Sequence, residues 1–180
     1  MNDFIKDLSQ RLSEKGYLVF APDLYKGKIA ESIEEAEKCI NSMEEDETKH
    51  ILAESVDYLL NITNRSIRVI GFSMGAGWAT WIANNKPESI EKVVLFYGTG
   101  EIDFSKTHAS FLCHFAENDP YEDPMYIDQF KEALKKANIQ ATHYHYQGTY
   151  HWFFETNQVD YYNKQASELA WKRTLKFLND

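Results

Sequence analysis

Short apolar runs alternate with helical stretches along the whole chain, and no repeat or flexible linker interrupts them. In the helical stretches, apolar residues recur every three or four positions. Strands separated by helices are typical of an α/β fold, here predicted as a mostly parallel sheet with helices on both faces. We expect one domain over residues 1–180. The runs of strand length are residues 17–20, 67–70, 92–97, 110–116 and 141–146.

Two further features predict where early helices lie. Asn2 or Asp3 can cap a first helix, and Gly16 can end it before the first apolar run. The acidic stretch at residues 31–47 has apolar residues at helical spacing, which predicts a helix with a solvated acidic face. A site for cations or basic proteins is the alternative interpretation of this stretch.

Charge and cysteine content limit the classes of partner and compartment. The chain has 28 acidic against 19 basic residues, a net charge of -9, which argues against nucleic acid and anionic membrane partners. Cys39 and Cys113 are far apart, and the sequence shows neither an apolar N-terminal h-region nor a run of about 18 apolar residues. We therefore expect a soluble, cytoplasmic protein with reduced thiols.

The segment Gly71-Phe72-Ser73-Met74-Gly75 directly follows a predicted strand and directly precedes a predicted helix. This is the context that a G-x-S-x-G nucleophile elbow requires. Its serine occupies a sharp turn, so we expect both glycines to be needed because side chains there would collide. The Met74 N–H would lie at the start of the helix, aimed at a developing oxyanion.

Two later residues have the settings of catalytic partners. Asp119 follows the run at 110–116, and His151 follows the last run and a loop opened by Gly148. Serine, acid and then histidine is the order of an α/β-hydrolase triad. We predict Ser73 as nucleophile, His151 as base and Asp119 as the carboxylate that orients it. Other acids in the same loop compete with Asp119: Glu117, Glu122 and Asp123, the last of which also suits a helix N-cap.

Aromatic residues near these positions predict a small apolar pocket for short, uncharged esters or lactones. We expect Tyr97, Trp152 and Phe153 to line it. His143 and His145 would share a face of a strand and, with His114, raise the alternative of a metal site. We favour structural histidines, no metal and no cofactor.

The chain resembles the dienelactone hydrolase family of the α/β-hydrolase superfamily over almost its whole length. The residues that carry the resemblance are Glu14-Lys15-Gly16-Tyr17, Ala21-Pro22-Asp23-Leu24-Tyr25, the elbow at 71–75, the loop around Asp119, and His151. The resemblance implies an α/β-hydrolase sheet and supports the three catalytic assignments.

The chain departs from the family's pattern in three ways. Position 73 is serine where members usually have cysteine, which favours esterase chemistry. Glu155 stands where dienelactone-processing members have an arginine for the substrate carboxylate. The chain also begins after the strands and the loop that donate the second oxyanion N–H, so we expect those N-terminal strands to be lacking.

These departures leave alternatives open. The strands at 17–20 and 67–70 pair directly, or another chain supplies the edge, or the native chain starts earlier. We expect exposed sheet edges to offer a route to a homo-oligomer. The predicted function is a serine hydrolase acting on carboxylic esters or lactones. The alternative is a weak or inactive hydrolase-like binding or assembly module.

Overall fold

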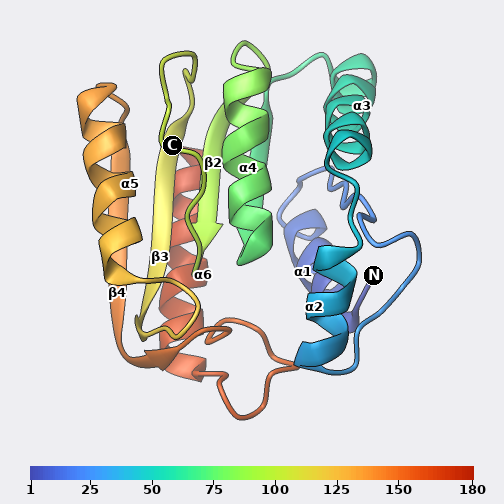
Figure 1. The fold of residues 1–180 in the computed structure, drawn as a ribbon. Helices are drawn as coiled ribbons and strands as arrows, with labels where there is room; N and C mark the ends of the chain where they lie inside the picture. The colour runs from blue at the N-terminus through green and yellow to red at the C-terminus, as the bar shows by residue number, and fades with distance from the viewer. The chain divides into compact units, whose positions relative to one another are not determined.

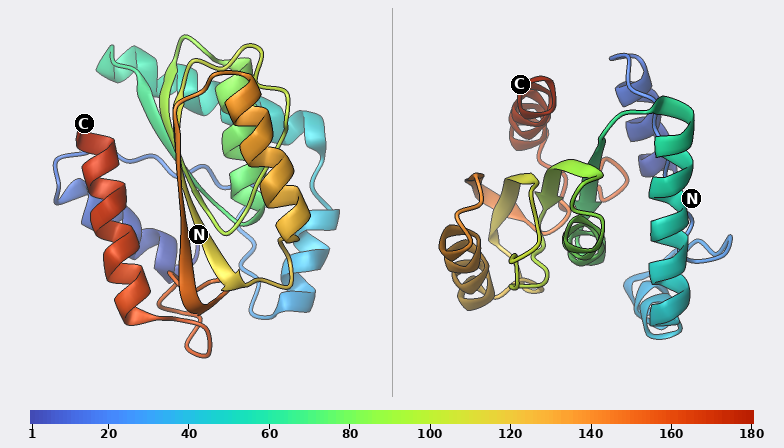
Figure 2. Two further views of the ribbon diagram at one scale, coloured as in Figure 1. Left: turned by 90° about the vertical axis from the view of Figure 1, so that its left-hand side faces the viewer. Right: turned by 90° about the horizontal axis from the view of Figure 1, so that it is seen from above.

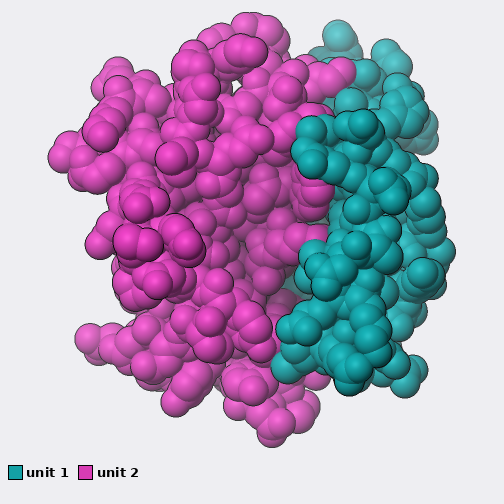
Figure 3. All heavy atoms as spheres, viewed as in Figure 1, with its two compact units in different colours: residues 1–64 teal, residues 65–180 magenta.

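The computed structural model describes residues 1–180, which divide into two compact units, residues 1–64 and residues 65–180 (Figure 3). The prediction of one domain over residues 1–180 stays a prediction. The first unit contains three helices: α1 (Asp3–Ser13), α2 (Ile33–Asn41) and α3 (Glu45–Thr63). None of the six helices in the chain combines the length and the hydropathy that a bilayer-spanning helix needs.

Helix α1 begins and ends where the sequence predicts. The Asn2 side chain accepts a hydrogen bond from the Ile5 N–H at 3.0 Å, and Gly16 follows the helix with φ of +88°. The acidic stretch differs from the prediction, because α2 ends at Asn41 and α3 begins at Glu45. Three acidic residues occupy the first turn of α3, where the helix dipole favours negative charge and therefore a new helix start.

The predicted strand at residues 17–20 is wrong. These residues lie outside the sheet and form no ladder with any strand, and Leu18 and Phe20 are 63% and 45% exposed. An extended segment becomes a strand only when a neighbouring backbone accepts and donates its hydrogen bonds.

The second unit is built on a four-stranded sheet with the order β1-β2-β3-β4, and all neighbouring strands are parallel (Figure 1). Helices α4 and α5 cover one face of this sheet and α6 covers the other (Figure 2). This confirms the predicted fold class. The bounds are β1 (Ile67–Phe72), α4 (Met74–Asn85), β2 (Ile90–Phe96), β3 (Ser110–Asn118), α5 (Pro124–Lys136), β4 (Ala141–Tyr150) and α6 (Lys164–Asn179).

The two central strands form the core of this unit. Val93, Val94 and Leu95 on β2 are fully buried, as are Phe111 and Cys113 on β3. Consecutive buried residues indicate that both faces of these strands are covered, as expected of a parallel sheet between helices. Because every strand runs in the same direction, the loops that follow the four strands meet at one edge of the sheet.

Candidate active site

Ser73 forms the turn between β1 and α4 and has an unusual backbone. Its φ of +49° and ψ of -120° lie outside the regions that L-residues normally occupy. The Ser73 N–H donates to the Phe96 carbonyl at 3.0 Å, which ties the turn to the end of β2. This sharp strand-to-helix turn is the geometry predicted from the sequence.

The glycines around this turn have different roles from those predicted. A Cβ on Gly71 would lie 2.3 Å from the Gly75 carbonyl oxygen, so residue 71 must lack a side chain. A Cβ on Gly75 would meet no heavy atom within 4 Å, so the predicted collision there is wrong. Gly98, which was not predicted, is the second residue near this turn that must lack a side chain, because its Cβ would lie 2.6 Å from the Ser73 carbonyl oxygen.

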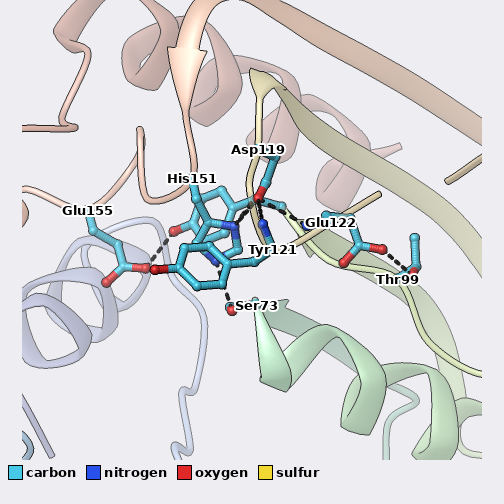
Figure 4. A network of polar contacts seen from close by, with 8 residues as sticks. Ser73, Thr99, Asp119, Tyr121, Glu122, His151 and Glu155 are labelled. Carbon is cyan, nitrogen blue, oxygen red and sulfur yellow. Dashed lines mark hydrogen bonds and ion pairs between the residues drawn. The ribbon is translucent and has the colours of Figure 1, made fainter. Parts of the chain in front are cut away.

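Ser73, His151 and Asp119 are joined by a continuous chain of hydrogen bonds (Figure 4). His151 Nε2 lies 2.9 Å from Ser73 Oγ, and His151 Nδ1 lies 2.8 Å from each carboxylate oxygen of Asp119. The side chains of His151 and Asp119 are only 3% and 4% exposed. The hydrogen bonds between them are therefore shielded from water, which strengthens them.

The loop after β3 folds around Asp119. Asp119 Oδ1 accepts hydrogen bonds from the Tyr121 N–H at 3.0 Å and the Glu122 N–H at 3.2 Å. The carboxylate therefore holds its own loop in shape while it faces His151. A side chain fixed in this way can hold an imidazole in one tautomer and one orientation.

The other acids of this loop bind elsewhere. Glu117 accepts the N–H of Gly148 at 2.8 Å, and Asp123 accepts the N–H of Met125 at 2.7 Å as the N-cap of α5. Glu122 accepts a hydrogen bond from the Thr99 hydroxyl, and burial raises its pKa. Of the four acids considered, only Asp119 contacts the histidine.

Aromatic rings surround the imidazole of His151. The ring centres of Tyr97, Tyr121 and Trp152 lie 4.8, 4.9 and 4.8 Å from it. Trp152 is half-buried, whereas Tyr97 and Phe153 are fully buried and pack on each other at 5.7 Å. Tyr97 and Phe153 thus belong to the core against which the histidine packs, and their predicted role in a substrate pocket stays a prediction.

A second carboxylate lies close to this histidine. The Tyr97 hydroxyl donates to Glu155 Oε1 at 2.7 Å, and burial raises the pKa of Glu155. Burial and the neighbouring Glu155 carboxylate raise the pKa of Tyr97 well above its ordinary value, so the hydroxyl keeps its proton and donates. The Tyr97–Glu155 hydrogen bond was not predicted, because no sequence pattern links a strand end to a loop 58 residues later.

Met74 is the first residue of α4, directly after Ser73. The backbone N–H groups of a helix's first turn point along the axis, at the positive end of the helix dipole. This position favours negative charge beside Ser73 Oγ. Met74 thus lies where the sequence predicts an oxyanion donor.

The remaining histidines do not converge on one point. His114 is buried between β3 and α6, where it hydrogen-bonds to Tyr146 and Thr174. His143 and His145 share the opposite face of the sheet, where both pack on Phe115. No group of three histidine, cysteine or acidic side chains is placed to hold a metal ion. The metal-site alternative therefore lacks its third ligand.

Comparisons with known proteins agree in sequence and in fold. A model of the dienelactone hydrolase family matches residues 1–180. Protein usf of Aquifex pyrophilus is 26% identical over 185 residues, covering 98% of this chain and 80% of its own length. An Aquifex aeolicus protein with the provisional name carboxymethylenebutenolidase is 24% identical over 182 residues, covering 96% of this chain and 79% of its own length.

Among solved structures, a protein of Klebsiella pneumoniae with the provisional name dienelactone hydrolase superposes with a TM-score of 0.85. The two sequences are 21% identical, and the match covers 97% of this chain and 80% of the other. At this identity the comparison establishes the fold. In this chain, the shared fold places the Ser73–His151–Asp119 hydrogen bonds at one edge of the sheet.

Proposed function

This chain belongs to the dienelactone hydrolase family, and membership of this family supports a hydrolase activity. We propose that the protein is a serine hydrolase of carboxylic esters or lactones. Ser73 is the nucleophile, His151 the general base and acid, and Asp119 the orienting carboxylate. The observation that carries this proposal is the unbroken hydrogen-bond chain from Ser73 Oγ through His151 to Asp119. This chain allows a proton to leave the serine as it attacks.

In the first step, Ser73 Oγ bonds to the ester carbonyl carbon while its proton passes to His151 Nε2. The carbonyl oxygen becomes an oxyanion, which the Met74 N–H stabilises at the start of α4. Collapse of this intermediate breaks the bond to the alcohol oxygen, which takes the proton back from Nε2. The alcohol leaves, and the acyl group remains esterified to Ser73.

In the second step, water replaces the alcohol. His151 Nε2 takes a proton from the water as its oxygen bonds to the acyl carbon, and Met74 again stabilises the oxyanion. The bond to Ser73 Oγ then breaks, the serine recovers its proton, and a carboxylic acid leaves. Through both steps Asp119 accepts the Nδ1–H of His151 and stabilises the transient imidazolium.

The charges around the site support a neutral substrate. The carboxylates of Glu122 and Glu155 both interact electrostatically with His151. An anionic acyl group would meet this negative field, whereas an uncharged ester or lactone would not. Trp152 beside the histidine offers apolar contact for such a substrate.

The test is covalent labelling of the wild-type protein by a fluorophosphonate probe, followed by peptide mass analysis. We expect one adduct, on Ser73, and its loss in Ser73→Ala and His151→Ala. Hydrolysis of a short neutral aryl ester should fall at least about 1000-fold in both variants. Ser105→Ala and His108→Ala, which replace exposed residues, are the matched controls and should keep both labelling and turnover.

Absence of any adduct on the folded wild-type protein would overturn the proposal and favour a binding or assembly module. Labelling that persists in Ser73→Ala would assign the nucleophile to another residue. Thermal unfolding of each variant separates loss of chemistry from loss of the fold.

A further inference from the structure

Strained backbone concentrates around His151. Of the six residues other than glycine with positive φ, Ser73 (+49°) bonds to the histidine, and Tyr97 (+36°) and Trp152 (+64°) pack on its ring. Such conformations persist only where the surrounding structure enforces them, and they cluster at functional sites. Tyr97 lies outside the three catalytic assignments, so its strain calls for a separate explanation.

Several contacts enforce the conformation of Tyr97. It directly follows β2, and its N–H donates to the His114 carbonyl at 2.8 Å. The next residue, Gly98, approaches the Ser73 backbone so closely that a side chain would not fit. The phenol ring is thereby fixed in the core with its centre 4.8 Å from that of His151. The strained backbone of Tyr97 thus holds its ring against the buried side of the imidazole.

Glu155 completes this arrangement. Its carboxylate accepts a hydrogen bond from the Tyr97 hydroxyl at 2.7 Å. Placing a carboxylate in a poorly hydrated site without a cation is costly. Burial raises the pKa of Glu155, and the Tyr97 hydrogen bond opposes this rise; a protonated His151 adds a smaller attraction in the same direction as the hydrogen bond. The imidazolium cation forms only when His151 accepts a proton.

We propose that Tyr97 and Glu155 act as a pair of positioning residues for His151. The Tyr97 ring supports the imidazole from the core, and the Glu155 carboxylate supplies a second negative charge, beside that of Asp119, which favours the imidazolium. This proposal rests on the proposed function, because it assigns a task to a histidine that cycles between neutral and protonated forms. Neither residue bonds to the substrate in this scheme.

Five other groups face His151, among them Trp152, whose ring centre lies 4.8 Å from that of the imidazole. Asp119 bonds to Nδ1, and Ser73 bonds to Nε2. Tyr121 packs on the ring from the loop after β3, and Glu122 of the same loop interacts with it electrostatically. In Figure 4, Glu155 lies on one side of His151 and Glu122 on the other. Glu122 is bound by Thr99, whereas Glu155 is linked through Tyr97 to a ring in contact with the imidazole.

The first measurement is the titration of the His151 imidazole by NMR, with the resonance assigned by its absence in His151→Ala. Removing the Glu155 charge in Glu155→Gln should move the titration midpoint to lower pH, because the protonated form loses an attraction. Glu155→Asp keeps the charge and should restore most of this shift. The readout is independent of turnover.

The second measurement is ester hydrolysis as a function of pH. In Glu155→Gln the acid limb of kcat/KM should move to lower pH with the NMR midpoint, and kcat should fall roughly 10-fold with little change in KM. Tyr97→Phe keeps the ring and removes the hydroxyl, so it should lower kcat roughly 3-fold to 10-fold. Its effect on the midpoint should be smaller than that of Glu155→Gln.

Tyr146→Phe is the matched control. Like Tyr97, Tyr146 is a buried tyrosine, but its hydroxyl bonds to His114 at 2.8 Å and it does not contact the triad. Its loss should lower thermal stability and leave the His151 midpoint and the pH profile unchanged.

An unchanged His151 midpoint in folded Glu155→Gln would overturn the proposal and make the pair a purely structural contact. If Glu155→Gln does not fold, a wild-type kcat and pH profile in Tyr97→Phe would overturn it instead. Failure of the proposed function would look different: the wild-type protein would neither label nor hydrolyse esters, while the midpoint would still report on the pair.

Discussion

Asp119 combines two tasks in one carboxylate. Its Oδ1 accepts two N–H groups of its own loop, and both of its oxygens lie 2.8 Å from His151 Nδ1. The first task needs an oxygen acceptor, whereas the second also needs a negative charge. An amide retains the first and loses the second, so the two can be separated by one substitution.

Asp119→Asn should therefore lower kcat by about 1000-fold to 10,000-fold while the melting temperature changes little, because an amide allows the wrong imidazole tautomer. Steady-state ester hydrolysis and thermal unfolding measure the two effects. Glu117→Gln, in an acid that binds the Gly148 N–H, is the control and should keep kcat within about 3-fold. A variant that unfolds would contradict the separation of the two tasks.

Alanine substitution should have different effects at the two glycines of the elbow, Gly71 and Gly75. Gly71→Ala should destabilise the protein by about 3 kcal/mol or more and abolish Ser73 labelling, because its Cβ would lie 2.3 Å from a carbonyl oxygen. Gly75→Ala, with open space around the new Cβ, should stay within about 1 kcal/mol of wild type. Denaturant unfolding measures both changes. Equal destabilisation in the two variants would show that the steric account is wrong.

Among the elements, the contact between β3 and α6 contains a buried polar group. His114 lies between the hydroxyls of Tyr146 and Thr174, and burial, assisted by Arg173, lowers its pKa from 6.5 to about 3. In the unfolded chain the same histidine gains a proton as the pH falls below about 6.5. Between these two values only the unfolded state binds the proton, so acid favours unfolding.

The free energy of unfolding should fall between pH 6.5 and pH 3, with His114 contributing up to about 1.4 kcal/mol per pH unit. In His114→Gln, whose new side chain does not titrate, the free energy of unfolding should fall less steeply with decreasing pH over this range. His108→Gln, at an exposed histidine paired with Glu88, should keep the wild-type slope. Urea unfolding at a series of pH values decides between these outcomes. Parallel curves for wild type and His114→Gln would rule out this contribution.

The elements that could be predicted are those whose signals are local. Asp123, whose residue type suits a helix N-cap, caps α5 through its own side chain. The run at 17–20 has the composition of a strand, but strand formation depends on a partner that local sequence does not reveal. The break between α2 and α3 was missed because helical apolar spacing continues across it.

In the candidate site, too, residues with local sequence signals could be predicted and contacts between distant segments could not. Ser73, Asp119 and His151 could be predicted because their order and their positions after strands are visible in the chain. Gly98 and the Tyr97–Glu155 hydrogen bond could not, because each depends on contacts between segments far apart in sequence. Aromatic residues close to the histidine in sequence suggested a pocket wall, but side-chain direction and packing decided which of them are buried.

At the scale of the whole molecule, charge should influence the choice of substrate. The chain has a net charge of -9, and two carboxylates besides Asp119, those of Glu122 and Glu155, interact with His151. For two aryl esters of the same alcohol, a neutral butyrate should have about 10-fold higher kcat/KM than a hemisuccinate with a free carboxylate. Steady-state kinetics on the two esters measures this ratio.

Added salt should reduce the difference in kcat/KM between the butyrate and the hemisuccinate, because it screens the field of the surface charges. Glu155→Gln should narrow it further by removing one local charge. A hemisuccinate hydrolysed as fast as the butyrate would show that this field does not reach the substrate.

The order of the strands in space repeats their order in the chain, so the sheet of residues 65–180 gains each strand beside the one before it. A chain that leaves the ribosome from its N-terminus can therefore extend this sheet one strand at a time, without inserting a late strand between two early ones. The serine emerges with the first strand, and the histidine emerges only after the fourth. During synthesis the protein would thus carry an inert hydroxyl until its sheet is complete, and chemical reactivity would appear as the last event of its assembly.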